Sequence, residues 1–278
     1  VGCLLTFWFI FLMWCTLWYY TWVLGTYSLA TVLGPIGLSC DGWFREHNLQ
    51  HHMYTNSPWD NHFEGTSPWL ITNPTVSRNV LQKLTPYINP LILSFGVWAN
   101  YINHAIDIAK GNATFHPFKL LLCIECVAMV YRHGILHGIL LMYTWTGVLG
   151  VYFFSIALIN HNSKHCHNIA VRNKSQDWGE AQVHTCADWD VRFGSFGFFI
   201  FLMLNLHTVH HLFPRVDCSH LPSIQAIFVK TCQDYHIPYK AGTFLNLYKE
   251  MIMTFATPES LNETIFVYPG GKCITDNE

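Results

Sequence analysis

The chain has 278 residues, of which 51% are hydrophobic and only 12% are charged. Soluble domains carry about a quarter charged residues, so this composition argues against an ordinary water-soluble globular protein. The formal net charge of −2 gives no basic surface of the kind that binds nucleic acid, and no nucleic-acid partner is expected.

The first forty residues contain no charged side chain, and the first charge is Asp41. A helix of that length would reach about 60 Å, roughly twice the hydrocarbon core of a bilayer, so a membrane span is predicted over about residues 1–24. Helix breakers follow at Gly25, Gly34, Pro35 and Gly37. The first residue is Val, and the chain is expected to be N-terminally incomplete.

The rest of the chain alternates between polar and apolar regions. Residues 41–117 are polar and rich in proline, and an amphipathic or interfacial helix is expected over 85–106. Residues 118–160 are apolar for long enough to form two spans, with a turn near Arg132 to His137. Residues 161–278 are again mainly polar. We therefore predict an all-α membrane protein whose transmembrane helices carry a helical cap, formed by 41–117 and 161–278.

Two histidine clusters lie on either side of the predicted hairpin. REHNLQHHMYTN (45–56) contains His47, His51 and His52, and NLHTVHHLFPRV (205–216) contains His207, His210 and His211. Residues three and four positions apart share one face of a helix, so each cluster can direct two or three imidazoles at one point, as a transition metal requires. Six clustered histidines exceed the needs of one metal ion that keeps an open position, which favours two metal ions.

Two intervening spans bring the chain back to the side from which it left, so both clusters can face one compartment. Positive residues flank the second cluster at Lys164, Arg172, Lys174, Arg192 and Arg215, which indicates the cytosolic side. His161, in the stretch INHN that ends the last predicted span, is a further candidate ligand.

Other ionisable residues receive different interpretations. His165 and His167 are expected to be solvated, and His133 and His137, four positions apart, to have structural or turn roles at the opposite membrane face. The ten cysteines are interpreted as small buried hydrophobic residues. Candidate acids for orienting the imidazoles are Asp41, Glu46, Asp188 and Asp190.

The motifs HNLQHHMYTN and HTVHHLFPRV resemble the second and third histidine boxes of the membrane fatty acid desaturases, especially the acyl-lipid and front-end branch. The resemblance covers about residues 26–255 and includes WFREHN, LFPRV, SHLPSI and INHN. It implies a single desaturase domain over 1–278, in which a cytosolic cap holds a non-haem di-iron centre. The residues that it implies as iron ligands are His47, His51, His52, His161, His207, His210 and His211.

The resemblance also implies a reaction and its partners. The expected function is O2-dependent insertion of a double bond into a fatty acyl chain, carried on a lipid or on coenzyme A, in the endoplasmic reticulum membrane. Electrons would come from cytochrome b5 and its reductase, with b5 separate or on a missing segment. The fused b5 domain of some relatives is marked by His-Pro-Gly-Gly, whereas this chain has Tyr268-Pro-Gly-Gly, which is interpreted as a turn.

Two departures from the family pattern keep alternatives open. Box three begins with His207 where front-end members usually have Gln, which leaves the regiochemistry open. The first histidine box should lie near residues 8–15, but these residues read WFIFLMWC, and no histidine precedes His47. The alternatives are a fatty acyl hydroxylase with the same site and a catalytically inactive, lipid-binding relative. A metal transporter is disfavoured, because the clusters lie outside the spans.

Overall fold

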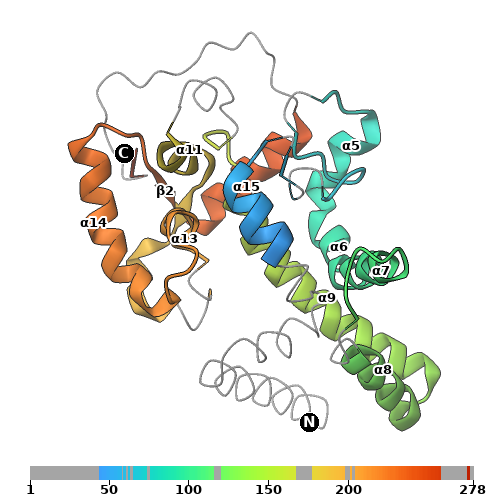
Figure 1. Ribbon diagram of the computed structural model, residues 1–278. Helices are drawn as coiled ribbons and strands as arrows, with labels where there is room; N and C mark the ends of the chain where they lie inside the picture. Colours follow the sequence, from blue (N-terminus) through green and yellow to red (C-terminus); the bar gives the residue numbers. More distant parts are fainter. Residues whose placement is uncertain are drawn as a thin grey trace. The chain divides into compact units, whose positions relative to one another are not determined.

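A computed structural model describes residues 44–57, 59–60, 62, 65–73, 76–115, 120–166, 177–197, 201, 204–257 and 274–275. The span predicted over 1–24, the segment WFIFLMWC, His167 and the turn at Tyr268 lie outside these ranges. The described chain is mainly helical, as predicted (Figure 1).

In chain order, the described helices before residue 116 are the π-helix η2 (Phe44–His51), α4 (His52–Tyr54), α5 (Val80–Leu84), the 3-10 helix η3 (Thr85–Ile88), α6 (Asn89–Leu93) and α7 (Gly96–Ala109). After residue 119 they are α8 (Leu120–His133), α9 (Ile135–Ile159), α11 (Trp178–Thr185), η5 (Val191–Phe196), α13 (His207–Leu212), η6 (Cys218–His220), α14 (Leu221–Asp234) and α15 (Phe244–Ala256). The single helix expected over 85–106 is thus divided among η3, α6 and α7.

A small parallel sheet corrects the all-α prediction. Its strands β1 (Asp188–Trp189), β2 (Lys240–Gly242) and β3 (Ile274–Thr275) lie in the order β1-β2-β3. Strands of two or three residues are too short to show an alternating hydrophobic pattern, so the sequence offered no signal for them.

The chain forms two compact units. Among the described residues, one contains Phe44, Arg45 and the described part of Leu93–Tyr152, and the other contains the described parts of Glu46–Ile92 and Phe153–Glu278. All the predicted ligand histidines belong to the second unit.

Helices α8 and α9 form a hairpin in the region predicted to contain two membrane spans, and their turn at Gly134 falls within the predicted range. As described, α8 has 14 residues, fewer than the roughly 17 that a span needs. Gly134 has φ +77°, a left-handed conformation that glycine adopts without steric cost. This turn separates His133, the last residue of α8, from His137 on α9, and both side chains are exposed. Within the described residues, α9 is the one helix long and apolar enough to cross a membrane.

A hydrophobic core joins this hairpin to α7. Val97, Leu122 and Met142 are its buried members, one from each helix. The two arms of the hairpin approach closely at Gly138, where an added Cβ would lie 2.5 Å from the backbone Cα of Val130 and 2.8 Å from the carbonyl carbon of Met129. Small residues allow helix backbones this close approach, which is common in membrane proteins.

The substitution Gly138→Ala is therefore expected to separate α8 from α9. The backbone atoms of α8 that would lie 2.5–2.8 Å from the new Cβ cannot move aside as the end of a flexible side chain can. Overpacking of this kind costs about 1–3 kcal/mol. The measurement is the thermal unfolding midpoint of the protein purified in detergent. The matched control is Gly147→Ala in the same helix, whose Cβ would meet Ser94 Cβ at an ordinary 3.4 Å. Equal midpoints for the two variants would contradict the prediction.

Candidate metal centre

Two of the three histidines of the first cluster lie on an unexpected type of helix. The sequence predicted an α-helix, whereas His47 and His51 lie on the π-helix η2 (Phe44–His51), and His52 is the first residue of α4. A π-helix closes its hydrogen bonds on residue i+5, and π-helical turns are frequent at functional sites. His51 and His52 are four and five positions after His47, so both lie about one turn beyond it. This winding explains how three histidines at that spacing direct their rings to one region.

The second cluster lies on α13, where His207, His210 and His211 follow the i, i+3, i+4 spacing of one helix face. His161 lies just beyond the end of α9. The structure brings all seven histidines named from the sequence together, and all are buried except His210, which is half-buried.

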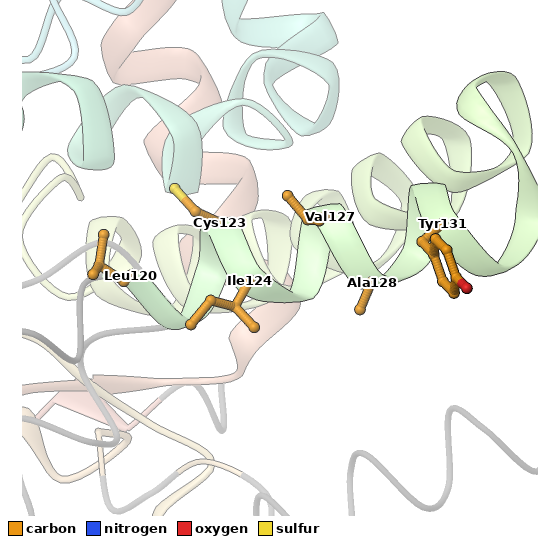
Figure 2. Close-up of a pocket in the computed structure, with 6 residues that line it drawn as sticks. All are labelled: Leu120, Cys123, Ile124, Val127, Ala128 and Tyr131. Atoms are coloured by element: carbon orange, nitrogen blue, oxygen red, sulfur yellow. The ribbon is translucent and has the colours of Figure 1, made fainter.

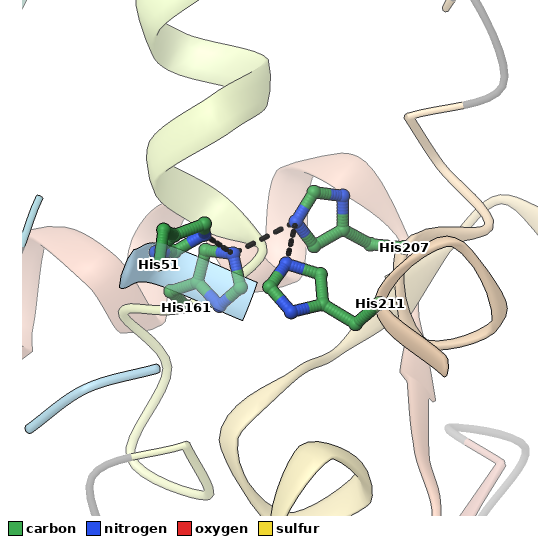
Figure 3. A group of neighbouring side chains, drawn as sticks. All are labelled: His51, His161, His207 and His211. Atoms are coloured by element: carbon green, nitrogen blue, oxygen red, sulfur yellow. Dashed lines mark hydrogen bonds between the residues drawn. The ribbon is translucent and has the colours of Figure 1, made fainter. Parts of the chain in front are cut away.

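Four of these histidines form one group with converging ring nitrogens (Figure 3). His161 Nε2 lies 2.7 Å from His207 Nε2 and 3.1 Å from His51 Nε2. His211 Nε2 lies 3.1 Å from His207 Nε2. The four nitrogens lie within 4.8 Å of one another. Two nitrogens bound at right angles to one metal at 2.0–2.1 Å would be about 2.9 Å apart, so this spacing matches a metal site.

Three more histidines form an adjacent group, His47, His52 and His210, again with one candidate ligand atom each within 4.8 Å. The Nε2 atoms of His47 and His210 are 3.4 Å apart. The buried Nε2 of His52 has no hydrogen-bond partner within the described part of the chain. Leaving a buried polar atom unsatisfied costs about 1–3 kcal/mol, and such atoms in native proteins call for an explanation. A metal ion would satisfy it.

In several of these rings the Nε2 atom points toward the other imidazoles, and the outer nitrogen, Nδ1, lies beside an oxygen atom. Nδ1 of His161 lies 3.0 Å from the carbonyl oxygen of Thr185, and Nδ1 of His51 lies 2.9 Å from Asp60 Oδ2. Nδ1 of His211 lies 2.9 Å from Gln182 Oε1. A carbonyl oxygen only accepts, so the ring of His161 donates from Nδ1 and turns the lone pair of Nε2 toward the other imidazoles. Metal-binding histidines are generally oriented by outer partners of this kind.

The electrostatic environment keeps these imidazoles neutral. Burial lowers the pKa of His161 to about 4 and that of His210 to about 3. Burial, reinforced by the neighbouring histidines, also holds the pKa values of His51 and His207 well below 6.5. A neutral imidazole is the form that binds a metal ion.

Sequence reasoning missed Asp60, Gln182 and His62. Asp60 is buried and accepts from the backbone N–H groups of Asn56 and His62, at 3.0 and 2.9 Å, besides its contact with His51. Burial raises the pKa of this carboxyl, and His62 opposes the shift. The acids predicted from nearness along the chain are Asp41, Glu46, Asp188 and Asp190, of which Asp41 lies outside the described residues. Asp60 instead approaches His51 because the chain turns after α4.

His165 and Asp188 also have roles other than those expected. His165 is half-buried, with its ring centroid 6.3 Å from that of His184, so the expectation that it is solvated is wrong. Asp188 touches no predicted ligand: its Oδ1 accepts from the backbone N–H and the hydroxyl of Thr208, at 2.7 and 2.9 Å. Its Oδ2 accepts from the Tyr239 hydroxyl at 2.8 Å and from the Gln225 amide at 2.9 Å.

Asp188 therefore holds the start of α13 in place, and Asp188→Asn is expected to loosen it. One carboxylate oxygen would become an amide group that cannot accept, and each buried donor left without an acceptor costs about 1–3 kcal/mol. The measurement is the thermal unfolding midpoint in detergent, with the exposed Asp234→Asn as the control. An unchanged midpoint for Asp188→Asn would show that the carboxylate does not support this helix.

Comparisons with known proteins agree with the histidine motifs. The sequence model described as fatty acid desaturase matches residues 18–243. The acyl-lipid (8-3)-desaturase of Mortierella alpina is 25% identical over 238 residues, covering 71% of this chain and 49% of the relative. The acyl-lipid (8-3)-desaturase B of Dictyostelium discoideum is 24% identical over 235 residues, covering 73% and 50%.

A third relative, the cytochrome b5-related protein of Drosophila melanogaster, is 23% identical over 202 residues, covering 69% of this chain and 46% of the relative. The chain thus spans about half the length of these curated relatives. No solved structure matches it significantly.

Proposed function

Because the chain belongs to the fatty acid desaturase family, we propose that it is an O2-dependent membrane desaturase that introduces a double bond into a fatty acyl chain. The observation that carries the proposal is the buried histidine cluster, which contains one group of four imidazoles and one group of three. The family implies oxidoreductase activity, and the cluster is suited to the metal that such a reaction needs.

Two iron ions are the metals proposed for this cluster. His51, His161, His207 and His211 would hold one iron, and His47, His52 and His210 would hold the other. Neutral imidazole is a suitable ligand for iron. Iron with O2 would supply the oxidising power needed to remove hydrogen from an unactivated methylene pair.

The residues around the cluster would orient its imidazole rings. Asp60, Gln182 and the Thr185 carbonyl hold the outer nitrogens of three rings, so their inner nitrogens stay aligned. Trp189, fully buried, donates from Nε1 to Asn160 Oδ1 at 2.6 Å and so anchors the residue before His161. Rigid placement of this kind lets a site bind metal without a large ordering cost.

The exposed side chains of the helical hairpin support a membrane location. One face of α8 forms a shallow apolar pocket, with Leu120, Cys123, Ile124, Val127, Ala128 and Tyr131 along it (Figure 2). On α9, Ile135 and Leu136 are 72% and 67% exposed. Large apolar patches of this kind are stable in contact with lipid but not with water. We propose that the hairpin lies in an endoplasmic reticulum membrane, with the histidine boxes on the cytosolic side.

Removing two hydrogens while O2 becomes two water molecules also consumes two electrons and two protons. A cytochrome b5 with its reductase is the electron donor that we propose, which the similarity to a cytochrome b5-related protein supports. The proposed substrate is an acyl group on a lipid or on coenzyme A, in line with the acyl-lipid desaturases among the relatives.

The test is expression in yeast together with cytochrome b5, followed by mass spectrometry of the cellular fatty acids and metal analysis of the purified protein. A new acyl species lighter by two hydrogens, together with bound iron, is expected. A species heavier by one oxygen would instead identify a hydroxylase. No product and no iron would instead support the catalytically inactive alternative.

A further inference from the structure

His62 is a histidine that neither histidine box contains. It lies ten residues after His52, in the turn that follows α4, and it is half-buried. The backbone N–H of His62 donates to Asp60 Oδ1 at 2.9 Å, while Asp60 Oδ2 contacts His51 Nδ1 at 2.9 Å. One carboxylate thus positions both the ring of His51 and the backbone of His62.

The ring of His62 reaches the cluster on the side of His47 and His51. Its centroid lies 4.6 Å from that of His51 and 5.7 Å from that of His47. The candidate ligand atoms of these three histidines all lie within 4.8 Å of one another. Two nitrogens on opposite sides of one metal would be about 4.1 Å apart, so a small movement brings His62 within reach of an ion bound by His47.

We propose that His62 is an additional metal ligand, which binds the same ion as His47, His52 and His210. The inference rests on the proposed function, since it assumes the metal centre. The groups themselves indicate which ion His62 joins: His51 already belongs to a group of four imidazoles, whereas His47 belongs to a group of three. With His62 the two groups contain four imidazoles each.

His62 would supply its imidazole from within the second unit, on a turn whose backbone Asp60 already holds in place.

The test compares iron binding by the full chain and by His62→Gln, purified in detergent and loaded with ferrous iron under anaerobic conditions. Gln keeps polarity and approximate size but has no imidazole. The expected result is a loss of about half the tightly bound iron, judged by elemental analysis, and a changed Mössbauer spectrum for the remainder. His165→Ala is the matched control, because His165 is also half-buried in the same unit but belongs neither to the two histidine groups nor to the set of His47, His51 and His62.

Chemical rescue separates a ligand from a structural histidine. With His62→Gly, millimolar free imidazole is expected to restore the lost iron, which a purely structural role would not allow. If the variants fail to fold, the wild-type protein still provides a test: metal loading should protect His62 from acylation by diethyl pyrocarbonate, as measured by peptide mass spectrometry.

Three results would overturn the inference: iron content and spectra of His62→Gln equal to those of wild type, no recovery with imidazole, or equal acylation of His62 with and without metal. These results differ from a failure of the proposed function. In that case the wild-type protein itself would bind no iron.

Discussion

His161→Ala is expected to abolish formation of the unsaturated product. His161 is the central member of the four-histidine group, with its Nε2 at 2.7 Å from His207 Nε2 and at 3.1 Å from His51 Nε2. Removing partners that only orient a ligand usually costs 10–100-fold in metal affinity or activity, so we expect the loss of a ligand itself to cost more than about 100-fold. The measurement is the yield of desaturated fatty acid in yeast, normalised to the amount of protein.

The control for this variant is His165→Ala, four residues further along the chain, which should keep its product and its iron. Product yields for His161→Ala similar to those of His165→Ala would contradict a role for His161 in the reaction. Thermal unfolding of the same samples distinguishes a lost ligand from a lost fold, since both would lose iron but only a misfolded protein would lose its thermal transition.

Asp60→Asn is expected to lower iron affinity by about 10–100-fold while leaving the protein folded. The carboxylate accepts from three groups: His51 Nδ1, the Asn56 N–H and the His62 N–H. An amide presents only one oxygen, so at least one of these donors would face an N–H group instead. The ring of His51 would then lose its fixed orientation.

The measurement for Asp60→Asn is competition for ferrous iron with a chelator of known affinity, and Asp234→Asn at an exposed position is its control. Loss of iron without loss of the thermal transition is the expected pattern. Wild-type iron affinity in Asp60→Asn would show that the metal centre does not need this carboxylate.

The main features of the candidate site could be predicted from spacing along the chain. His207, His210 and His211 share a helix face because three- and four-residue separations bring side chains together on any α-helix. The turn of the apolar hairpin was equally predictable, because a glycine between two long apolar segments is a local signal. The family followed from the same local motifs, and the match over residues 18–243 confirms it.

Other features depend on contacts between segments far apart in the chain. Asp60 reaches His51, Gln182 reaches His211, and His62 lies beside His47, although no periodic pattern connects these positions. The π-helical winding at His47 could not be inferred either, since a spacing of four and five residues also fits an α-helix.

Asp188 illustrates why some features could be predicted from local spacing and others could not. Its place near box three in space comes from strand β1, and its partners Thr208, Gln225 and Tyr239 come from three separate segments. Local spacing determines which side chains share a face, because backbone geometry repeats along a helix. Which distant polar groups complete the site is decided by packing, because each buried imidazole and carboxylate must find its hydrogen-bond partners wherever the folded chain supplies them.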